Sequence, residues 1–229
     1  MYKYLLWDVD GTVLDFLAAE AYAIRTLFKK YNIGECTDKM LKRYSAINAE
    51  YWRKLENNEL TKEEILIGRF HEFFNEIGAD TEIAEDFNRD YQETLGDCVV
   101  FIENAKELLL SKKGKYTIAA VTNGTRVAQE KKLKNSGLDK IFDAVFISEN
   151  IGSEKPNKAF FDYVFEKLGI CDKKEVLIIG DSLSGDMRGG FNYGIDTCWF
   201  NPSHNENTLN IPVTYEIAKL CEIENIVKM

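Results

Sequence analysis

Short apolar runs alternate with amphipathic stretches along most of this chain. Five runs have the apolar, β-branched or aromatic character of buried strands: Tyr2–Trp7, Tyr116–Val121, Ala144–Ile147, Val176–Ile179 and Thr197–Phe200. Helical patterns lie between the later runs, near Glu103–Leu110, Thr125–Asn135, Lys158–Leu168 and Ser184–Phe191. Strands that alternate with helices favour right-handed βαβ units. The pattern therefore predicts an α/β fold whose parallel sheet is covered on both faces.

A different pattern follows the first predicted strand. Apolar residues recur at three- and four-residue spacing in four stretches, Phe16–Tyr31, Asp38–Asn57, Thr61–Ile77 and Thr81–Leu95. Thr61 and Glu64 form a capping-box signature at the start of the third stretch. Because no strand pattern interrupts this block, we expect an all-helical domain at residues 15–96. It would be inserted into an α/β core domain made of residues 1–14 and 97–229.

Composition narrows the class of partner. The 229 residues include 38 Asp and Glu against 29 Lys and Arg, a formal net charge of −9. Neutralising a nucleic acid polymer requires clustered basic residues, so we expect no such partner, whereas a small phosphorylated ligand remains compatible. Apolar runs fall far short of the ~18 residues that span a membrane. With no signal-peptide pattern and five dispersed cysteines, we expect a cytoplasmic protein of undetermined oligomeric state.

Polar residues follow the predicted strands where they end, and ligands bind at the carboxyl ends of open parallel sheets. The segments are Asp8-Val9-Asp10-Gly11-Thr12, Thr122-Asn123-Gly124, Lys155-Pro156 and Gly180-Asp181 with Asp186. Each alone has an ordinary explanation as a turn or a helix cap. If the four segments were unrelated turns, we would not expect acidic, hydroxyl and ammonium side chains to gather at the same edge of the sheet. We therefore expect a site with four carboxylates, a hydroxyl and an ammonium.

The ordered motifs Asp8-x-Asp10-Gly11-Thr12, Thr122, Lys155 and Gly180-Asp181-x4-Asp186 resemble those of the haloacid dehalogenase-like phosphohydrolase superfamily. The helical insertion lies where that superfamily carries a C1-type cap. The resemblance implies a Rossmann-like sheet core with a helical cap, and Mg²⁺-dependent hydrolysis of phosphomonoesters through an aspartyl-phosphate. A finer resemblance, to bacterial pyrimidine 5′-nucleotidases, rests on Tyr44-x3-Asn48-x3-Trp52, Gly68-Arg69-Phe70, Gly194–Asn201 and Tyr215–Ile217.

The resemblance also implies a role for each motif residue. Asp8 is expected to be the nucleophile and Asp10 the general acid and base. Thr122 and the N–H groups around Asn123 would hold the phosphoryl oxygens. Lys155 would neutralise developing charge and steady Asp8.

Counting charges supports a bound cation at the expected site. Asp8, Asp10, Asp181 and Asp186 together carry −4, which would repel a phosphate dianion. A magnesium ion and Lys155 reduce this to −1, and protonation of Asp10 brings it to zero. An all-oxygen ligand set suits Mg²⁺. By resemblance, the ligands are the Asp8 and Asp181 side chains and the Asp10 backbone carbonyl, with Asp186 acting directly or from a second layer.

The leaving group is expected to be recognised by the helical insertion. Tyr44, Asn48 and Trp52 recur every four positions and share a helix face, and Arg69 is a fourth candidate. A face of this kind is equally explained as hydrophobic core, and Arg69 as a surface ion-pair partner. We expect a pyrimidine nucleoside monophosphate as substrate. A phosphatase or mutase for small sugar phosphates or phosphoglycolate, a Mg²⁺-independent dehalogenase and a non-enzymatic binding protein remain alternatives.

Overall fold

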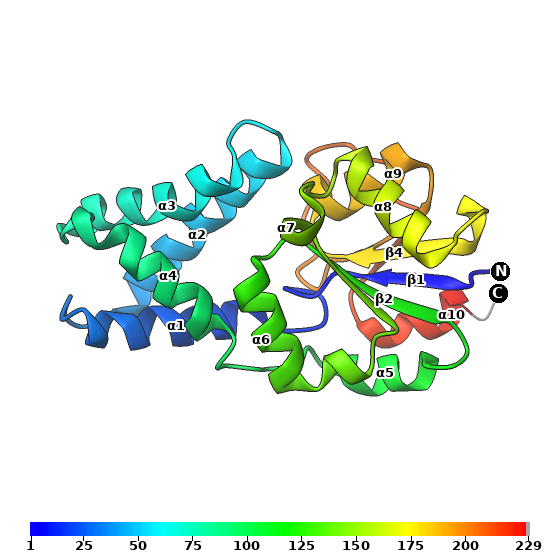
Figure 1. Cartoon of the computed structure of the whole chain (residues 1–229), viewed down its shortest axis with the longest axis horizontal. Helices are drawn as coiled ribbons and strands as arrows, with labels where there is room; N and C mark the ends of the chain where they lie inside the picture. Colours follow the sequence, from blue (N-terminus) through cyan, green and yellow to red (C-terminus); the bar gives the residue numbers. More distant parts are fainter. Residues whose placement is uncertain (228–229) are drawn as a thin grey trace.

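The computed structural model describes residues 1–227, whose centre is a six-stranded parallel sheet in the order β3-β2-β1-β4-β5-β6 (Figure 1). The strands are β1 (Tyr4–Trp7), β2 (Thr117–Thr122), β3 (Ala144–Ile147), β4 (Val176–Gly180), β5 (Asp196–Phe200) and β6 (Tyr215–Ile217). Strand β1 pairs with β2 on one side and with β4 on the other. The residue that follows Trp7 therefore lies at the middle of the carboxyl edge.

Alternate strand residues face two different helical layers. The core helices are α5 (Ala105–Lys112), α6 (Arg126–Ser136), α7 (Ser148–Ile151), α8 (Lys158–Leu168), α9 (Arg188–Tyr193) and α10 (Ile223–Val227). Leu5 and Trp7 pack in the hydrophobic cluster that contains α5 and α10 residues, whereas Leu6 packs with residues of α8 and α9. In Figure 1, α8 and α9 lie above the sheet, and α5 and α10 lie below it. The predicted α/β class with a doubly covered parallel sheet is confirmed.

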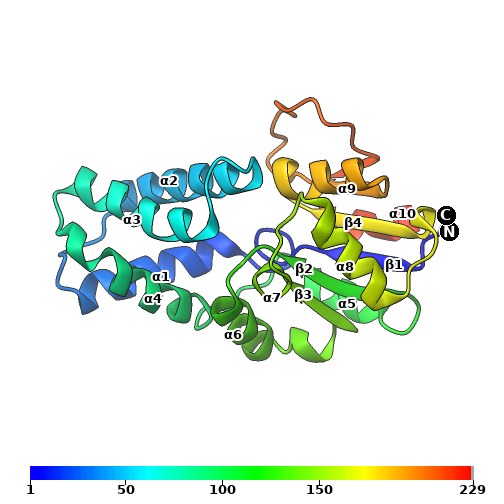
Figure 2. The same ribbon diagram turned by 45° about the horizontal axis from the view of Figure 1, so that its top comes forward.

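Four helices between β1 and α5 form their own apolar interior. They are α1 (Phe16–Lys30), α2 (Asp38–Glu56), α3 (Lys62–Ile77) and α4 (Ala84–Leu95), and we call residues 16–95 the four-helix block. The capping box expected at Thr61 and Glu64 is present. In Figures 1 and 2 the block lies beyond the carboxyl ends of the strands. The helices occur where they were expected, while the domain boundaries at residues 15 and 96 stay a prediction.

Short elements differ from the pattern that the sequence indicates, among them helix α7, which was not expected. The helix expected near Ser184–Phe191 begins as a π-helical turn at Leu183–Met187 and continues as α9. Strand β6 and helix α10 were not expected, because a three-residue strand with an exposed centre offers no apolar run to detect. All of these differences concern short elements around the carboxyl edge or the sheet margin.

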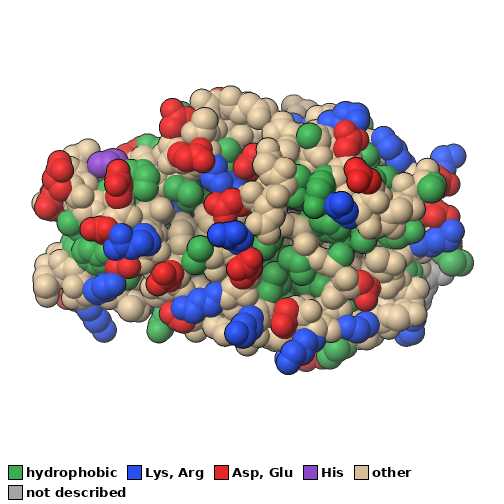
Figure 3. Space-filling model, viewed as in Figure 1, with side chains coloured by type: hydrophobic (Ala, Val, Ile, Leu, Met, Phe, Trp, Pro, Cys, Tyr) green, Lys and Arg blue, Asp and Glu red, His purple; other side chains and the backbone are tan. Residues whose placement is uncertain are grey.

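The described surface carries charges of both signs. On the face shown in Figure 3, Lys and Arg side chains are interspersed with Asp and Glu, without a broad patch of one sign. Within residues 1–227, no helix has both the length and the apolar character needed to cross a lipid bilayer.

Candidate active site

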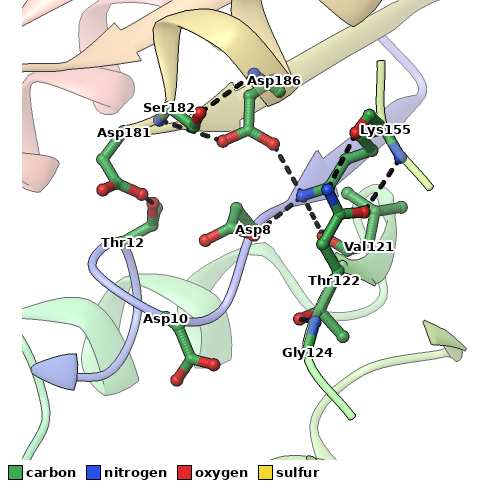
Figure 4. Close-up of polar contacts among 12 residues, drawn as sticks. Asp8, Asp10, Thr12, Val121, Thr122, Gly124, Lys155, Asp181, Ser182 and Asp186 are labelled. Atoms are coloured by element: carbon green, nitrogen blue, oxygen red, sulfur yellow. Dashed lines mark hydrogen bonds and ion pairs between the residues drawn. The ribbon is translucent and has the colours of Figure 1, made fainter. Parts of the chain in front are cut away.

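A buried lysine joins two carboxylates at the carboxyl edge of the sheet (Figure 4). Lys155 Nζ donates to Asp8 Oδ1 at 2.8 Å and to Asp186 Oδ1 at 2.7 Å. It also donates to the Val121 carbonyl at 2.7 Å, so all three ammonium protons have acceptors. Burial lowers the pKa of Lys155, but the Asp186 and Asp8 carboxylates outweigh it and raise that pKa above its ordinary value. The lysine is therefore a permanent positive charge.

The turn after β1 requires a glycine. Gly11 has φ +91°, and a Cβ at this position would lie 2.6 Å from Oδ2 of Asp181. The turn brings the Thr12 hydroxyl to Asp181, to whose Oδ1 it donates at 3.0 Å. The Asp8 N–H donates to the Ile179 carbonyl at 2.9 Å, which fixes the start of the turn against β4.

The π-helical turn after β4 orients Asp186. The Ser182 N–H donates to Asp186 Oδ2 at 3.2 Å, while Oδ1 of the same carboxylate accepts from Lys155. The Ser182 hydroxyl accepts from the Gly185 N–H at 2.9 Å and so caps the turn. Asp186 is 1% exposed. Single π-helical turns occur frequently at functional sites.

Three carboxylates at this edge are close enough to share a cation. Asp8, Asp181 and Asp186 each offer an oxygen within 4.8 Å of the other two. Burial raises the pKa of Asp8, and Lys155 offsets this only in part. Desolvation, and then the like charge of Asp186, raise the pKa of Asp181. One ammonium is thus too little positive charge for three ionised carboxylates, and these oxygen donors fit Mg²⁺.

Asp10 points away from this carboxylate cluster (Figure 4). Its Oδ2 accepts from Gln129 Nε2 at 2.5 Å, and its Oδ1 accepts from Lys132 Nζ at 2.6 Å. Both partners come from α6, and the Lys132 side chain is only 2% exposed. Both oxygens of the Asp10 carboxylate are thus held by α6, and the side chain would have to change these contacts to reach a leaving group at the carboxylate cluster.

Thr122 and Asn123, expected to hold phosphate, have different surroundings. The Thr122 hydroxyl oxygen accepts from the Gly124 N–H at 3.1 Å, which leaves its own proton for another acceptor. The Asn123 side chain instead forms two hydrogen bonds with the backbone of Lys155. Its Nδ2 donates to the Lys155 carbonyl at 2.8 Å and its Oδ1 accepts from the Lys155 N–H at 2.9 Å. The Asn123 amide therefore positions the lysine, and any phosphate contact would come from backbone N–H groups.

A cavity of about 410 Å³ lies between the motif residues and the four-helix block. Its floor contains all seven core residues expected in the site: Asp8, Asp10, Thr122, Asn123, Lys155, Asp181 and Asp186. Its roof comes from α1 and α2 of the block. The cavity is thus bounded by segments that are far apart in the sequence.

The four expected cap residues divide between the cavity and the interior of the block. Asn48 and Trp52 line the cavity. Tyr44 is fully buried and stacks on Phe70, with ring centroids 5.2 Å apart. A four-residue step advances about 40° beyond a full helical turn, so Tyr44 and Trp52 differ by about 80° around α2. Tyr44 is therefore a core residue and does not contact the cavity, contrary to the shared face that the spacing suggests.

Arg69 also lies away from the cavity, but it acts on a residue that lines it. The Arg69 guanidinium is 1% exposed and donates through Nη1 to Asn48 Oδ1 at 2.6 Å. Its Nη2 donates to Asn88 Oδ1 at 3.0 Å. Arg69 is thus neither a surface ion-pair partner nor a direct ligand contact; it fixes the orientation of the Asn48 amide.

The polar residues around the cavity that the sequence analysis missed include Glu20, Glu56, Gln129 and Lys132. A signal existed for two of them. Glu56 continues the four-residue spacing of Asn48 and Trp52, and Glu20 interrupts the buried apolar stripe of α1. Gln129 and Lys132 are ordinary polar residues one helical turn apart, so only the packing of α6 reveals them.

A model of the family described as haloacid dehalogenase-like hydrolase matches residues 5–200. The HAD-hydrolase YfnB of Bacillus subtilis (strain 168) is 40% identical over 228 residues, covering 100% of this chain and 96% of that protein. Its crystal structure superposes with a TM-score of 0.93 at 39% identity, covering 100% of this chain and 99% of that one. That structure is described as bound to magnesium and as revealing interdomain movement.

Two other similar proteins are pyrimidine 5′-nucleotidases. PynA of Streptococcus pneumoniae (strain ATCC BAA-255 / R6) is 36% identical over 217 residues, covering 94% of this chain and 91% of that protein. YjjG of Escherichia coli (strain K12) is 29% identical over 225 residues, covering 98% of this chain and 97% of that protein.

Proposed function

The chain belongs to the haloacid dehalogenase-like hydrolase family, and on that basis we propose that it hydrolyses phosphomonoesters through an aspartyl-phosphate on Asp8. The observation that carries this proposal is the position of Lys155, whose ammonium lies between Asp8 and Asp186 at the floor of the cavity. This arrangement supplies a carboxylate nucleophile and a fixed positive charge at one point. Phosphoryl transfer requires both positioning and charge stabilisation.

The proposed reaction has two steps. First, an Asp8 oxygen forms a bond to phosphorus while the bond from phosphorus to the leaving oxygen breaks, and that oxygen takes a proton from Asp10. Second, a water molecule attacks the same phosphorus, Asp10 takes a proton from it, and the bond from phosphorus to Asp8 breaks. The Asp10 side chain must release Gln129 and Lys132 before the first step, because both of its oxygens accept hydrogen bonds from them in this structure. The Thr122 hydroxyl would hold a phosphoryl oxygen throughout, and Lys155 would neutralise developing negative charge and steady Asp8.

We propose Mg²⁺ as the cofactor, held by Asp8, Asp181 and Asp186, with the backbone carbonyl of Asp10 as a further donor. The convergence of three carboxylate oxygens within 4.8 Å supports this assignment. When bound, the ion would neutralise the acidic cluster and polarise the phosphoryl group. Asp186 can serve the ion and Lys155 together, because its two oxygens point to different partners.

We propose a pyrimidine nucleoside monophosphate as substrate and residues 15–96 as a cap that selects it. The similarity to two pyrimidine 5′-nucleotidases supports this choice. Trp52 supports it as well, since its half-buried indole lines the roof of the cavity. Stacking of a base on an aromatic ring is worth ~1–3 kcal/mol.

The hydrolysis proposal is tested by phosphate release from a generic aryl phosphate. Asp8→Asn is expected to keep the fold and lose turnover to background, whereas Asp139→Asn, an exposed control, keeps full activity. Chelation should abolish turnover and Mg²⁺ should restore it. Ca²⁺ should substitute poorly, because its looser coordination misplaces the oxygens. Substantial turnover by pure Asp8→Asn, or full activity in excess chelator, would overturn the proposal.

A further inference from the structure

A second acidic feature lies in the roof of the cavity, away from the motif residues. Glu20 is 1% exposed and lines the cavity from α1. Its Oε1 accepts from the Ser45 hydroxyl, and its Oε2 accepts from Asn48 Nδ2 at 2.7 Å. Within residues 1–227 no lysine or arginine forms an ion pair with this carboxylate. A buried charge without an ion-pair partner is costly, and this one lies where a leaving group would sit.

The surrounding hydrogen bonds hold Glu20 as an acceptor. Arg69 donates to Asn48 Oδ1 at 2.6 Å, so the amide oxygen of Asn48 is engaged on the far side. The Asn48 amide nitrogen must then face Glu20. An ionised carboxylate has about four lone-pair sites, and Ser45 and Asn48 occupy two of them. The remaining sites can accept N–H or O–H groups of a bound molecule.

The rest of the cavity wall adds to the negative charge. Six described lining residues carry carboxylates: Asp8, Asp10, Glu20, Glu56, Asp181 and Asp186. The two cationic lining residues are Lys155 and Arg53. Lys155 donates to Asp186 at the floor of the cavity, and the Arg53 guanidinium donates to Glu50 at 2.7 Å. A divalent cation at the floor would still leave the wall negative. A second anionic group on the substrate would therefore meet repulsion rather than a partner.

We propose that Glu20 is a specificity-determining residue that accepts hydrogen bonds from a neutral leaving group and excludes leaving groups that carry a carboxylate. This inference rests on the proposed phosphomonoester hydrolysis and adds the chemistry of the leaving group. A nucleoside fits the description, because its hydroxyl and ring N–H groups are donors and it carries no charge. Phosphoglycolate, an alternative left open by the sequence, does not fit.

The proposal is tested with two small phosphoesters that differ in one group. 2-Phosphoglycolate carries a carboxylate where 2-hydroxyethyl phosphate carries a hydroxymethyl group. For the wild-type protein, kcat/KM is expected to be about 10- to 100-fold higher for 2-hydroxyethyl phosphate. In Glu20→Gln this preference should shrink about tenfold, because the glutamine is neutral and nearly isosteric. Glu85→Gln, an exposed cap residue outside the cavity, should keep the wild-type ratio.

A third substrate tests the hydrogen-bonding part. For uridine 5′-monophosphate, kcat/KM should fall about tenfold in Glu20→Gln relative to Glu85→Gln, since a neutral acceptor replaces a charged one. An unchanged ratio between the two small esters in folded Glu20→Gln would overturn the proposal, as would wild-type preference for 2-phosphoglycolate. A wild-type preference for 2-phosphoglycolate would overturn the proposal even if Glu20→Gln does not fold. Failure of the proposed hydrolysis would look different, as no Mg²⁺-dependent phosphate release from any of the three esters.

Discussion

Two buried charged side chains, Lys155 and Glu20, differ in whether oppositely charged groups or only neutral groups hydrogen-bond to them. Lys155 has two carboxylates and a carbonyl as acceptors, so its burial is offset by close pairing. Among the described residues, the hydrogen-bond donors to the Glu20 oxygens are the neutral side chains of Ser45 and Asn48. Burial raises the pKa of Glu20, while these two hydrogen bonds and the more distant Arg69 charge counteract it in part. The ionised Glu20 therefore destabilises the folded protein.

This difference predicts a pH-dependent effect of Glu20→Gln on stability. At low pH the carboxyl group is protonated in both folded and unfolded chains, and burial carries little electrostatic cost. As pH rises through the raised pKa, the folded chain must hold a buried anion, and its free energy of unfolding falls. Glu20→Gln should thus be more stable than wild type at neutral pH, on the order of 1 kcal/mol, with the gap closing toward acid.

Urea unfolding of both proteins at several pH values measures this gap. Glu85→Gln provides the control, since removing an exposed carboxylate should give no comparable trend with pH. A gap independent of pH, or a Glu20→Gln protein less stable than wild type at neutral pH, contradicts the assignment of Glu20 as a buried charge that its neighbours compensate only in part.

For single residues, the sequence predicted the site residues that directly follow strand ends. It did not predict the residues that reach the site only through the packing of a distant helix. The floor of the cavity could be predicted because parallel strands place their carboxyl ends together, whatever the intervening chain does. The partners of Asp10 could not, since Gln129 and Lys132 reach it only through the way α6 packs against the turn after β1. Side-chain orientation within the site depends on such tertiary contacts.

Helix α2 shows that the bounds of an element can be predicted from the sequence while the face that it turns to the cavity cannot. Its bounds were predicted closely, because the Thr37 side chain caps its start and an apolar stripe runs along its length. The face of α2 that lines the cavity was not predicted correctly, because each four-residue step is rotated about 40° further around the helix axis. Tyr44 consequently packs against Phe70 in the block interior, while Trp52 lies in the roof.

Because Tyr44 and Trp52 point to different sides of α2, we expect their alanine substitutions to have different effects on stability and on substrate selectivity. Tyr44→Ala removes a fully buried ring and should lower the free energy of unfolding by about 3–5 kcal/mol, by analogy with other large aromatic truncations. Trp52→Ala should cost much less stability and lower kcat/KM for uridine 5′-monophosphate relative to 2-hydroxyethyl phosphate by about tenfold or more. Denaturant unfolding and steady-state kinetics measure the two effects. Equal loss of stability, or unaltered selectivity in Trp52→Ala, would refute the division of roles.

Across the whole molecule, the four-helix block meets the core on two sides of the cavity. On one side its two connections run side by side, with Asp15 N–H donating to the Val100 carbonyl at 2.8 Å and Ile102 N–H to the Val13 carbonyl at 3.0 Å. On the other side the end of α2 reaches the π-helical turn, where Glu56 accepts from the Ser182 hydroxyl at 2.9 Å. Polar contacts at the second side can separate, whereas the covalent connections cannot.

Lys62 contributes to the separable side and offers a test of cap opening. Its Nζ donates to the Ser148 hydroxyl at 2.7 Å and lies 3.2 Å from a Glu154 carboxylate oxygen, both in the core. Lys62→Met keeps most of the side-chain stem but removes these contacts, so we expect the block to separate from the core more often. Hydrogen exchange should then quicken at the end of α2, and KM should rise with little change in kcat. Lys42→Met, an exposed lysine of α2, should leave both unchanged. Exchange and KM like those of wild type in Lys62→Met would show that this contact does not hold the cap closed.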